Sequence, residues 1–394
     1  MRFPAAPGLN LQATIGPRIA SAGWERPSPK PPFYDLGVGP TWASSTTWLV
    51  ADSENVTSED ITLHGAGDMA FLESGGKCGH TYRRIKLTRD QTARGAKRRP
   101  PGLISSNVDA FHSWSCGTGP ILEGSNLSFA GDDQINIHGQ LFVAAGALGG
   151  TSADPRHGEL IVVDFGDAVY DPLGPRARLL STFEAVSAGD HLEFYAVQKP
   201  PVPVPPGGNG VTVAKIERAR DPELVAAALA LPSTLQKPPF NVGIFPLVRP
   251  PFVKVGGFPL VYKVTLAGDA GKAVAASVAH GSLLWAQFPT RCGPGALVRN
   301  NTLMTTYDHV ARVSSDGFRF ERNSVHCRSP DPGFAVNVLC LPDWLQAKFS
   351  LRNISFVSNS MRGCGAVPSA VFSASPGGCT TAVDGLVVAN NSYN

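Results

Sequence analysis

The sequence predicts an all-β protein: a right-handed parallel β-helix interrupted by a β-barrel-like insertion. The 394 residues include 42 glycines and 34 prolines, a content typical of folds with many turns. Short alternating segments that lead into polar, often Asn-bearing turns recur along the chain, and such repetition indicates stacked units. This rhythm stops at about residue 141 and resumes near residue 290, which predicts an inserted domain.

The repeated unit is about 20–30 residues long with two or three short strands, which fits one coil of a parallel β-helix. Ile61 and Ile85 occupy matching positions about 24 residues apart. Asn suits such turns because it tolerates left-handed backbone conformations and forms side-chain ladders. Several glycosylation sequons fall at these turns, so turn geometry explains them without a glycan; the sequons begin at Asn55, Asn126, Asn300, Asn353 and Asn390.

The chain divides into four expected regions. Residues 1–40 form an N-terminal extension that is partly disordered or caps the coils, and residues 41–150 form coils that carry the candidate catalytic motif. Residues 151–290 form the β-rich, barrel-like insertion, with strand-like runs such as LIVVDF, HLEFYAV and FPLVYKVTLAG. Residues 291–394 return to the coils. The clearest helical pattern lies at 221–233, where Pro232 would end it.

Composition excludes several classes of protein. The net charge is +3 with scattered basic residues, and no zinc-finger, heptad or single-strand-binding motif predicts a nucleic-acid partner. No apolar run is long enough to span a membrane. The seven cysteines include no CxxC pair, so a zinc or redox site is not expected. The N-terminal residues make a poor signal peptide. Local disulfides are expected among Cys327, Cys340, Cys364 and Cys379.

Three carboxylates are spaced at the interval of one coil. Asp109 precedes the adjacent pair Asp132 and Asp133 by about 23 and 24 residues. Neighbouring parallel strands lie about 4.8 Å apart, so the three acids are expected to share one patch of the coil surface. Like charges at that distance resist simultaneous ionisation, so at least one carboxyl should have a raised pKa. A carboxylic acid beside a carboxylate is the requirement of glycoside hydrolysis.

The neighbours of these acids favour a functional site over turn capping or calcium binding, which Asp pairs also perform. His112 follows Asp109, and alternation from Asp132 places Gln134, Asn136 and His138 on the same face, with Ile135 and Ile137 inside. Polar groups gathered around acids match the hydroxyls of a sugar. The sequence therefore predicts a sugar pocket lined by His112, Asn136 and His138.

The stretch NVDAFHSWSCGTGPILEGSNLSFAGDDQINIHG at 107–139 resembles the core motif of the α-1,3-galactosidases of glycoside hydrolase family 110. The resemblance covers residues 41–150 and, more faintly, 288–394; the middle matches in layout alone. It implies a secreted, inverting, exo-acting galactosidase that needs no metal or cofactor. It also implies that Asp132 is the general acid and that Asp109 and Asp133 handle the water.

One departure from the family pattern lies in DWLQAKF, where Gln346 stands two residues after Trp344 in place of the family's usual glutamate. Trp344 is expected either to stack on the apolar face of galactose or to be buried. If the glutamate of the family binds galactose, Gln346 alters specificity or abolishes cleavage. The N-terminal coils also look short, which predicts a different cap.

A polygalacturonase-like enzyme is the nearest enzymatic rival, because the chain contains NVD at 107–109 and RIK at 84–86. The basic motif precedes the acids instead of following them, and no Gly-His-Gly follows, so Arg84 and Lys86 are expected at the surface. A non-catalytic β-helix that binds carbohydrate is the second rival, since the fold alone does not define an activity.

The expected partner is a galactose-terminated oligosaccharide or polysaccharide, with a homodimer left open as an assembly. The expected location is extracellular or in the secretory pathway, as the resemblance implies.

Overall fold

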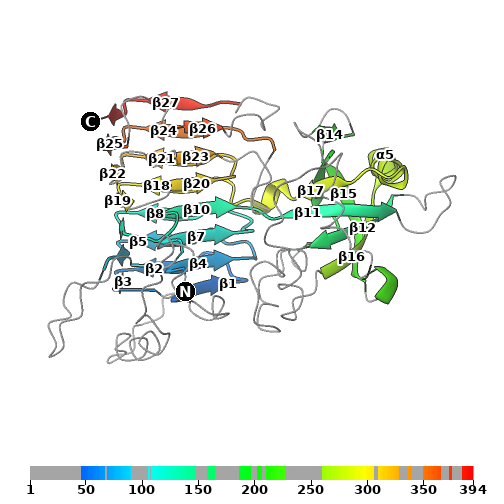
Figure 1. Cartoon of the computed structure of the whole chain (residues 1–394), viewed down its shortest axis with the longest axis horizontal. Helices are drawn as coiled ribbons and strands as arrows, with labels where there is room; N and C mark the ends of the chain where they lie inside the picture. The colour runs from blue at the N-terminus through cyan, green and yellow to red at the C-terminus, as the bar shows by residue number, and fades with distance from the viewer. Residues whose placement is uncertain are drawn as a thin grey trace, which may run out of the picture.

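The computed structural model describes the following residues: 46–66, 69–89, 105–106, 108–147, 158–164, 186–196, 202–205, 210–219, 221–224, 226, 260–305, 309–327, 336–338, 349–364, 372–374 and 384–393. Strands dominate this part of the chain, and three of its four sheets are parallel. The expected all-β class agrees with these elements. Figure 1 shows the parallel sheets stacked on one side and the fourth sheet on the other.

The chain visits the three parallel sheets in turn, and each sheet has seven strands. The first sheet consists of β1 (Trp48–Ala51), β4 (Phe71–Ser74), β7 (Phe111–Trp114), β10 (Ile135–His138), β20 (Ala311–Val313), β23 (Val336–Val338) and β26 (Phe372–Ala374). The second consists of β2 (Thr57–Glu59), β5 (Thr81–Arg83), β8 (Ile121–Glu123), β18 (Leu297–Arg299), β21 (Arg319–Glu321), β24 (Ser355–Val357) and β27 (Val387–Ala389). The third consists of β3 (Thr62–Leu63), β6 (Lys86–Leu87), β9 (Asn126–Ser128), β19 (Thr302–Thr305), β22 (Ser324–Cys327), β25 (Ser360–Arg362) and β28 (Ser392–Tyr393).

We call one strand from each sheet, taken in chain order, a coil. Register between the first two coils advances by 24 residues, from Thr57 to Thr81, and the same step joins Phe111 to Ile135. The step from Thr81 to Ile121 is longer, because additional residues separate β6 from β7. Ile61 and Ile85 lie at the same corner of successive coils, where the amide of Lys86 donates to the carbonyl of Ile61.

The corner between the second and third sheets has a repeated backbone conformation. A residue with positive φ occupies it in each coil: Asp60, Arg84, Gly124, Asn300, Arg322, Ser358 and Asn390. The next residue projects into a buried ladder in the later coils. There the amide of Asn301 donates to Asn323, that of Asn323 to Asn359 and that of Asn359 to Asn391. The ladder pairs side chains along the stack, as identical amide side chains do in stacked β-structure.

The fourth sheet interrupts the fourth coil between β10 and β18. Its strands are β11 (Leu141–Ala147), β12 (Glu159–Asp164), β13 (His191–Ala196), β14 (Pro203–Val204), β15 (Val211–Arg218), β16 (Leu260–Leu266) and β17 (Leu284–Gln287). Antiparallel pairings connect β11, β12, β16, β15, β13 and β17 and return to β11, with β14 attached to β13. We call this set the antiparallel ring.

The boundary of the insertion lies earlier than predicted. The expected start is residue 151, but the strand that begins at Leu141 already pairs within the antiparallel ring. Helix α5 (Gly268–Ala279) lies between β16 and β17, the short 3-10 helix η4 (Pro289–Arg291) follows β17, and neither was predicted. Residues 222–224 of the predicted helix at 221–233 are helical, and most of that span lies outside the described residues.

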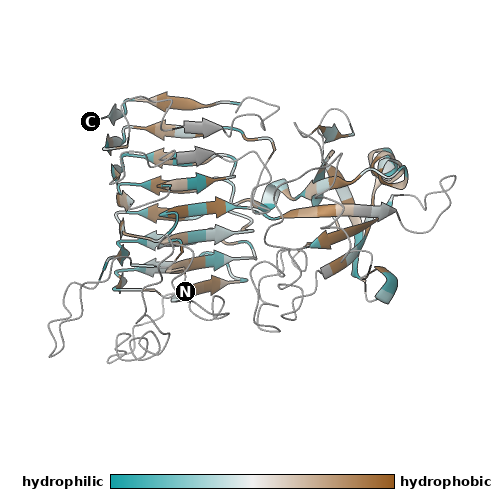
Figure 2. Cartoon of the chain, viewed as in Figure 1, coloured by the Kyte–Doolittle hydropathy of each residue, from teal (hydrophilic) through white to brown (hydrophobic). Residues whose placement is uncertain are grey.

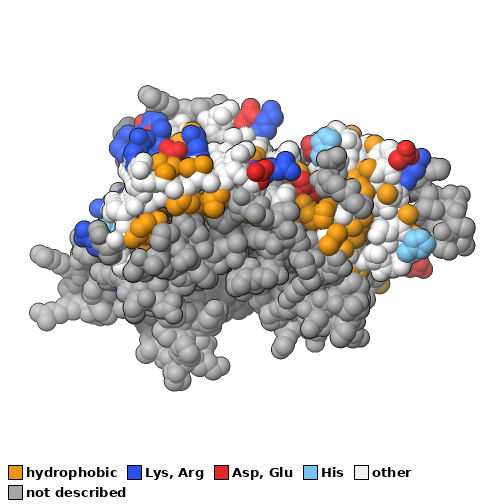
Figure 3. Space-filling view, turned by 90° about the horizontal axis from the view of Figure 1, so that it is seen from above, with side chains coloured by type: hydrophobic (Ala, Val, Ile, Leu, Met, Phe, Trp, Pro, Cys, Tyr) orange, Lys and Arg blue, Asp and Glu red, His pale blue; other side chains and the backbone are white. Residues whose placement is uncertain are grey.

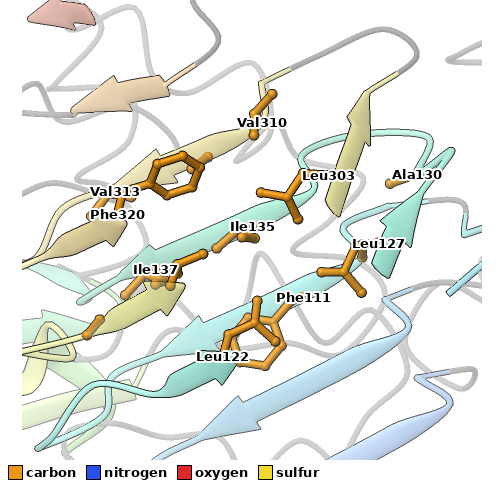
Figure 4. Packing of buried hydrophobic residues seen from close by; sticks show 14 of the residues in the cluster. Phe111, Leu122, Leu127, Ala130, Ile135, Ile137, Leu303, Val310, Val313 and Phe320 are labelled. Atoms are coloured by element: carbon orange, nitrogen blue, oxygen red, sulfur yellow. The ribbon is translucent and has the colours of Figure 1, made fainter. Parts of the chain in front are cut away.

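The coils and the antiparallel ring each contain a hydrophobic cluster. One fills the space enclosed by the parallel sheets and includes Phe111, Ile135, Ile137 and Phe320, whose side chains converge in Figure 4. The other lies inside the antiparallel ring and includes Phe142, Val162 and Phe194. Figure 2 shows the apolar strands of both parts in brown. Burying each large side chain contributes about 1.5–3 kcal/mol, so each part has a core of its own.

Candidate functional site

The three predicted acids converge at the turns that lead into the first sheet. Asp109 precedes β7, while Asp132 and Asp133 precede β10 on the next coil. The backbone amide of Ala110 donates to the carbonyl of Asp133, so Asp109 and Asp133 stack directly. One carboxylate oxygen from each of Asp109, Asp132 and Asp133 lies within 4.8 Å of the others. The spacing in the sequence thus produces one acidic cluster.

The three acids differ in their exposure. Asp109 is 2% exposed and Asp133 is 1% exposed, whereas Asp132 is half-buried. A substrate or water approaching from outside therefore meets Asp132 first. Crowded carboxylates with little access to water repel one another strongly, because the surrounding protein screens charge far less than bulk water.

Two histidines, His112 and His138, are linked to Asp109 by hydrogen bonds in series. Nδ1 of His112 lies 2.5 Å from Oδ2 of Asp109, and Nε2 of His112 lies 2.8 Å from Nε2 of His138. Nδ1 of His138 lies 2.7 Å from the carbonyl oxygen of Gly139. Both imidazoles are buried, although alternation places them on the face of β7 and β10 opposite the core residues Phe111, Ile135 and Ile137. The predicted pocket residues His112 and His138 therefore contact each other, and His112 also contacts Asp109.

Burial controls the charge of these histidines. It lowers the pKa of His112 to about 3, partly offset by the negative charge of Asp133. Burial also lowers the pKa of His138 well below the usual range, and the neighbouring His112 lowers it further. Both imidazoles are consequently neutral at physiological pH.

The next coil adds two residues that the sequence did not reveal as part of the site. Nδ1 of His309 lies 3.0 Å from Oδ1 of Asp133, and the register places Arg312 beside Asn136. These residues follow the inserted ring in the chain, so the interval of one coil does not predict them. Only the return of the chain to the coil after the insertion brings them back to the acids.

Asn136 and Gln134 complete the described surroundings. Asn136 is 3% exposed and is the register partner of His112 on β7 and of Arg312 on β20. Gln134 is fully buried beside Asp133, and neither polar atom of its side chain has a hydrogen-bond partner. The side-chain amide of Gln134 is therefore a further candidate to bind a sugar hydroxyl. Trp344 and Gln346 lie outside the described residues.

Two other features bear on the site. The three carboxylates of the acidic cluster have the oxygen ligands that a cation prefers, so they are also the candidate metal-binding group of this part of the chain. A second group places Glu73 within 4.8 Å of Cys78 and Cys116. Those two cysteines are joined in a disulfide, so their sulfurs are not thiolate ligands.

The predicted surface position of the RIK segment agrees with the structure. Arg84 and Lys86 are exposed, and the guanidinium of Arg84 donates to both carboxylate oxygens of Asp60. Arg84 thus forms an ion pair with Asp60 of the preceding coil.

No model of a known protein family matches the chain, and a search of curated proteins finds no similar sequence. Among the described residues, no helix combines the length and the apolar character needed to cross a membrane.

Proposed function

We propose that this protein is a glycoside hydrolase built on a right-handed parallel β-helix with a β-barrel-like insertion. In this reading each coil is one rung of the helix, and the antiparallel ring is the inserted barrel. The ordered visits of the chain to three parallel sheets support the β-helix, since consecutive parallel strands need crossover connections rather than hairpins.

The proposed reaction releases terminal α-1,3-linked galactose with inversion. The observation that carries it is the convergence of Asp109, Asp132 and Asp133 within 4.8 Å. A structural coil gains nothing from three crowded carboxylates, whereas glycoside cleavage needs a carboxylic acid and a carboxylate at one bond. The choice of α-1,3-linked galactose rests on the resemblance of residues 107–139 to family 110.

Asp132 is the proposed general acid, and its greater exposure suits contact with the glycosidic oxygen. Its proton passes to that oxygen as the bond from the sugar carbon to the oxygen breaks. Asp133, with Asp109, takes a proton from the water whose oxygen bonds to the same carbon. Transfer of that proton back to Asp132 restores the resting state. Sugar hydroxyls would bind to Asn136, Gln134 and the histidines, with Trp344 as a further proposed contact.

The separation of the two carboxyl groups bears on the stereochemical outcome. Inverting pairs of carboxyl groups are about 6.5–9.5 Å apart and retaining pairs about 5–5.5 Å apart. The nearest oxygens here lie within 4.8 Å, so a water must sit against the outer oxygens of the carboxylates. Inversion therefore rests on the family resemblance, and the anomer of the first product decides it.

Secretion is part of the proposal. Disulfides join Cys78 to Cys116 and Cys327 to Cys364, and stable disulfides are typical of oxidising compartments outside the cytosol. The second pair agrees with the expectation of local disulfides among the late cysteines. Cys340 and Cys379 lie outside the described residues.

The test is hydrolysis of an α-1,3-linked galactobiose, beside its α-1,4 and α-1,6 isomers and an oligogalacturonide. We expect galactose from the 1,3 isomer, and a loss of at least about 100-fold in kcat/KM for Asp132→Asn, because general acid–base catalysis contributes about 10²–10⁴-fold. Asp316→Asn is a matched control, because this aspartate lies at a different corner of the coils, where it accepts from the amide of Arg352. Binding of the disaccharide without cleavage would show that the protein is a carbohydrate-binding protein rather than a hydrolase.

A further inference from the structure

Four of the five glycosylation sequons share one structural setting. Their asparagines lie at the two corners that flank the second sheet, with φ values of 55–56° and exposed side chains: Asn55, Asn300, Asn353 and Asn390. In each sequon the hydroxyl residue two positions later is the first residue of a strand: Thr57 of β2, Thr302 of β19, Ser355 of β24 and Ser392 of β28. We call these four residues the corner asparagines.

The fifth sequon has a different setting. Asn126 is itself the first residue of β9 and is half-buried. Its Oδ1 accepts a hydrogen bond of 2.7 Å from the hydroxyl of Ser128. Register partners flank it on both neighbouring coils, Lys86 on one side and Thr302 on the other. The side chain of Asn126 therefore lies within a sheet and is bonded to the hydroxyl of its own sequon.

The left-handed turn explains the asparagine but does not require the complete sequon. Asn adopts a positive φ at little cost. Nine other residues with positive φ occupy the same two corners, and only four of them have Ser or Thr two positions later. Those nine are Asp60, Gly79, Arg84, Gly124, Gly295, Gly317, Arg322, Ser358 and Gly385. All four corner asparagines have the hydroxyl, so these positions combine the turn with an acceptor site for a glycan.

The last coil leaves one edge of the stack open. β26, β27 and β28 each stand at the end of their sheet, and Figure 1 shows β27 at the top of the stack. Within the part of the chain that the structure describes, no strand pairs with the outer edge of β27. Three of the five exposed large apolar side chains of that part lie here, Leu386, Val387 and Val388. An open apolar edge is a template for pairing with another chain.

Two corner asparagines stand at the two ends of this edge strand. Asn390 follows the last residue of β27 directly. At the other end the backbone amide of Asn353 donates to the carbonyl of Asp384 at 2.7 Å, and its Oδ1 lies 2.7 Å from the position of a Cβ on Gly385. A glycan is bulky and strongly hydrated. Glycans on these two side chains would therefore cover both approaches to β27.

We propose that the corner asparagines carry N-linked glycans, and that those on Asn353 and Asn390 prevent the open edge of β27 from pairing with a second copy of the chain. The donor is an oligosaccharide attached to a lipid pyrophosphate. A bond forms from Nδ2 of the asparagine to the anomeric carbon, and the bond from that carbon to the pyrophosphate oxygen breaks. The oxygen keeps the electron pair and Nδ2 loses a proton, so no oxidant or reductant takes part.

The setting of the protein fits this modification. The two disulfides of the described coils are typical of the oxidising compartments in which N-glycans are added. The proposal shares this location with the proposed function, but it does not depend on the reaction. Its tests measure modification and mass, so a failed galactosidase assay leaves their results intact.

Peptide mapping tests the modification. The full chain is isolated from the cells that produce it, and its glycans are released by peptide N-glycosidase in ¹⁸O-labelled water, which converts each modified asparagine to labelled aspartate. We expect the label at all four corner asparagines and none at Asn126. A corner asparagine without label would overturn the assignment at that position. Absence of label from both Asn353 and Asn390 would overturn the proposal as a whole.

A pair of double variants tests the role of the two glycans. Ser355→Ala with Ser392→Ala removes the sequon hydroxyls at the open edge and leaves the corner asparagines in place. Thr57→Ala with Thr302→Ala is the matched control, because it removes the same number of glycans away from β27. By sedimentation we expect the first variant to form dimers as concentration rises, so that its mass doubles. The control should keep the mass of the wild type.

A third change identifies the surface responsible. Adding Val387→Lys to the first variant should restore the mass of the wild type, because a charge on an edge strand opposes pairing. Circular dichroism checks that every variant is folded. Equal association of the two double variants, or dimers that persist with Val387→Lys, would show that the glycans do not protect the edge of β27.

Discussion

At the scale of single residues, Glu73 is a fully buried acid outside the acidic cluster. It lies on β4 and points into the core, where the hydroxyl of Ser113 donates to Oε1 at 2.6 Å. Burial raises the pKa of Glu73 to about 8, and hydrogen bonding from Ser113 and from Tyr82 offsets only part of the rise. Glu73 is therefore a neutral acid in the folded protein.

The raised pKa predicts a specific dependence of stability on pH. Between about pH 4.5 and pH 8 the folded protein keeps the Glu73 proton while the unfolded chain loses it, so stability falls as pH rises. The slope is at most about 1.4 kcal/mol per pH unit. Glu73→Gln should remove this contribution and flatten the profile of unfolding midpoint against pH.

The matched control is Glu54→Gln, which changes an exposed acid paired with Lys77. Unfolding midpoints measured from pH 5 to pH 8 should fall with the same slope in the control and in the wild type. Equal slopes in all three proteins would contradict the burial of an uncharged Glu73.

The acids of the site were largely predictable from the sequence at this scale. The spacing of Asp109 and Asp133 is the spacing of one coil, and the parallel register converts it into contact. Alternation also placed Ile135 and Ile137 in the core. The contact between His112 and His138 was not predicted, because it runs diagonally between coils. The contact of His309 with Asp133 was not predictable, because the two residues are 176 positions apart and no local sequence pattern connects them.

At the scale of elements, the asparagine ladder stabilises the corner between the second and third sheets. Asn323 is 1% exposed, and its amide donates to the carbonyl of Val298 and to Oδ1 of Asn359. Its own Oδ1 accepts from the backbone and side chain of Asn301. One side chain thus links three coils.

Asn323→Ala should destabilise the protein by about 1–3 kcal/mol, because it leaves buried partners without hydrogen bonds. Asn300→Gly is the matched control: Asn300 is exposed with a φ of 56°, and glycine adopts that conformation freely. Denaturant unfolding should separate the two variants, with the control within about 0.5 kcal/mol of the wild type. Equal free energies of unfolding for the two variants would show that the asparagine ladder does not stabilise the protein.

The ladder refines the expectation from the Asn-rich turns. A ladder was expected, but it is formed by the residue after the left-handed position. Asn300 and Asn390, which begin sequons, have φ values of 56° and are exposed, whereas Asn301 and Asn391 form the hydrogen bonds. Helix α5 was missed because its alanines and glycines give only a weak amphipathic pattern, with Val274, Ala275 and Val278 buried.

At the scale of the whole molecule, the coils and the antiparallel ring have separate cores but touch. The rings of Tyr195 and Phe349 lie 4.7 Å apart, and the guanidinium of Arg291 donates to the carbonyl of Gly76. The last coil exposes Leu386, Val387 and Val388 by 47%, 50% and 42%. Figure 3, seen from above Figure 1, shows apolar side chains among basic ones at this end.

Separate cores predict that the coils tolerate removal of the ring. Leu141 and Gln287 are register partners on β11 and β17, so a short turn can replace residues 142–286 without moving the coils. We expect the shortened chain to keep a cooperative thermal transition and the circular dichroism of β-structure. A chain without a cooperative transition would show that the coils depend on the ring.

The loss of rhythm at about residue 141 coincides with the start of β11, whereas the domain boundary was placed ten residues later, at residue 151. The partner of β11 within the ring, β17, lies far along the chain, so the pairing itself had no local signal. The strand-rich fold with parallel sheets was predictable because a fixed repeat with polar turns indicates stacked units.

The most direct test of the central claim is the anomer of the first sugar released from α-1,3-linked galactobiose, followed by ¹H nuclear magnetic resonance before mutarotation. We expect β-galactose to appear first, and Asp132→Asn to release none over the same time. First release of α-galactose would contradict inversion. If the folded wild type releases no galactose, these three carboxylates do not form an α-1,3-galactosidase site.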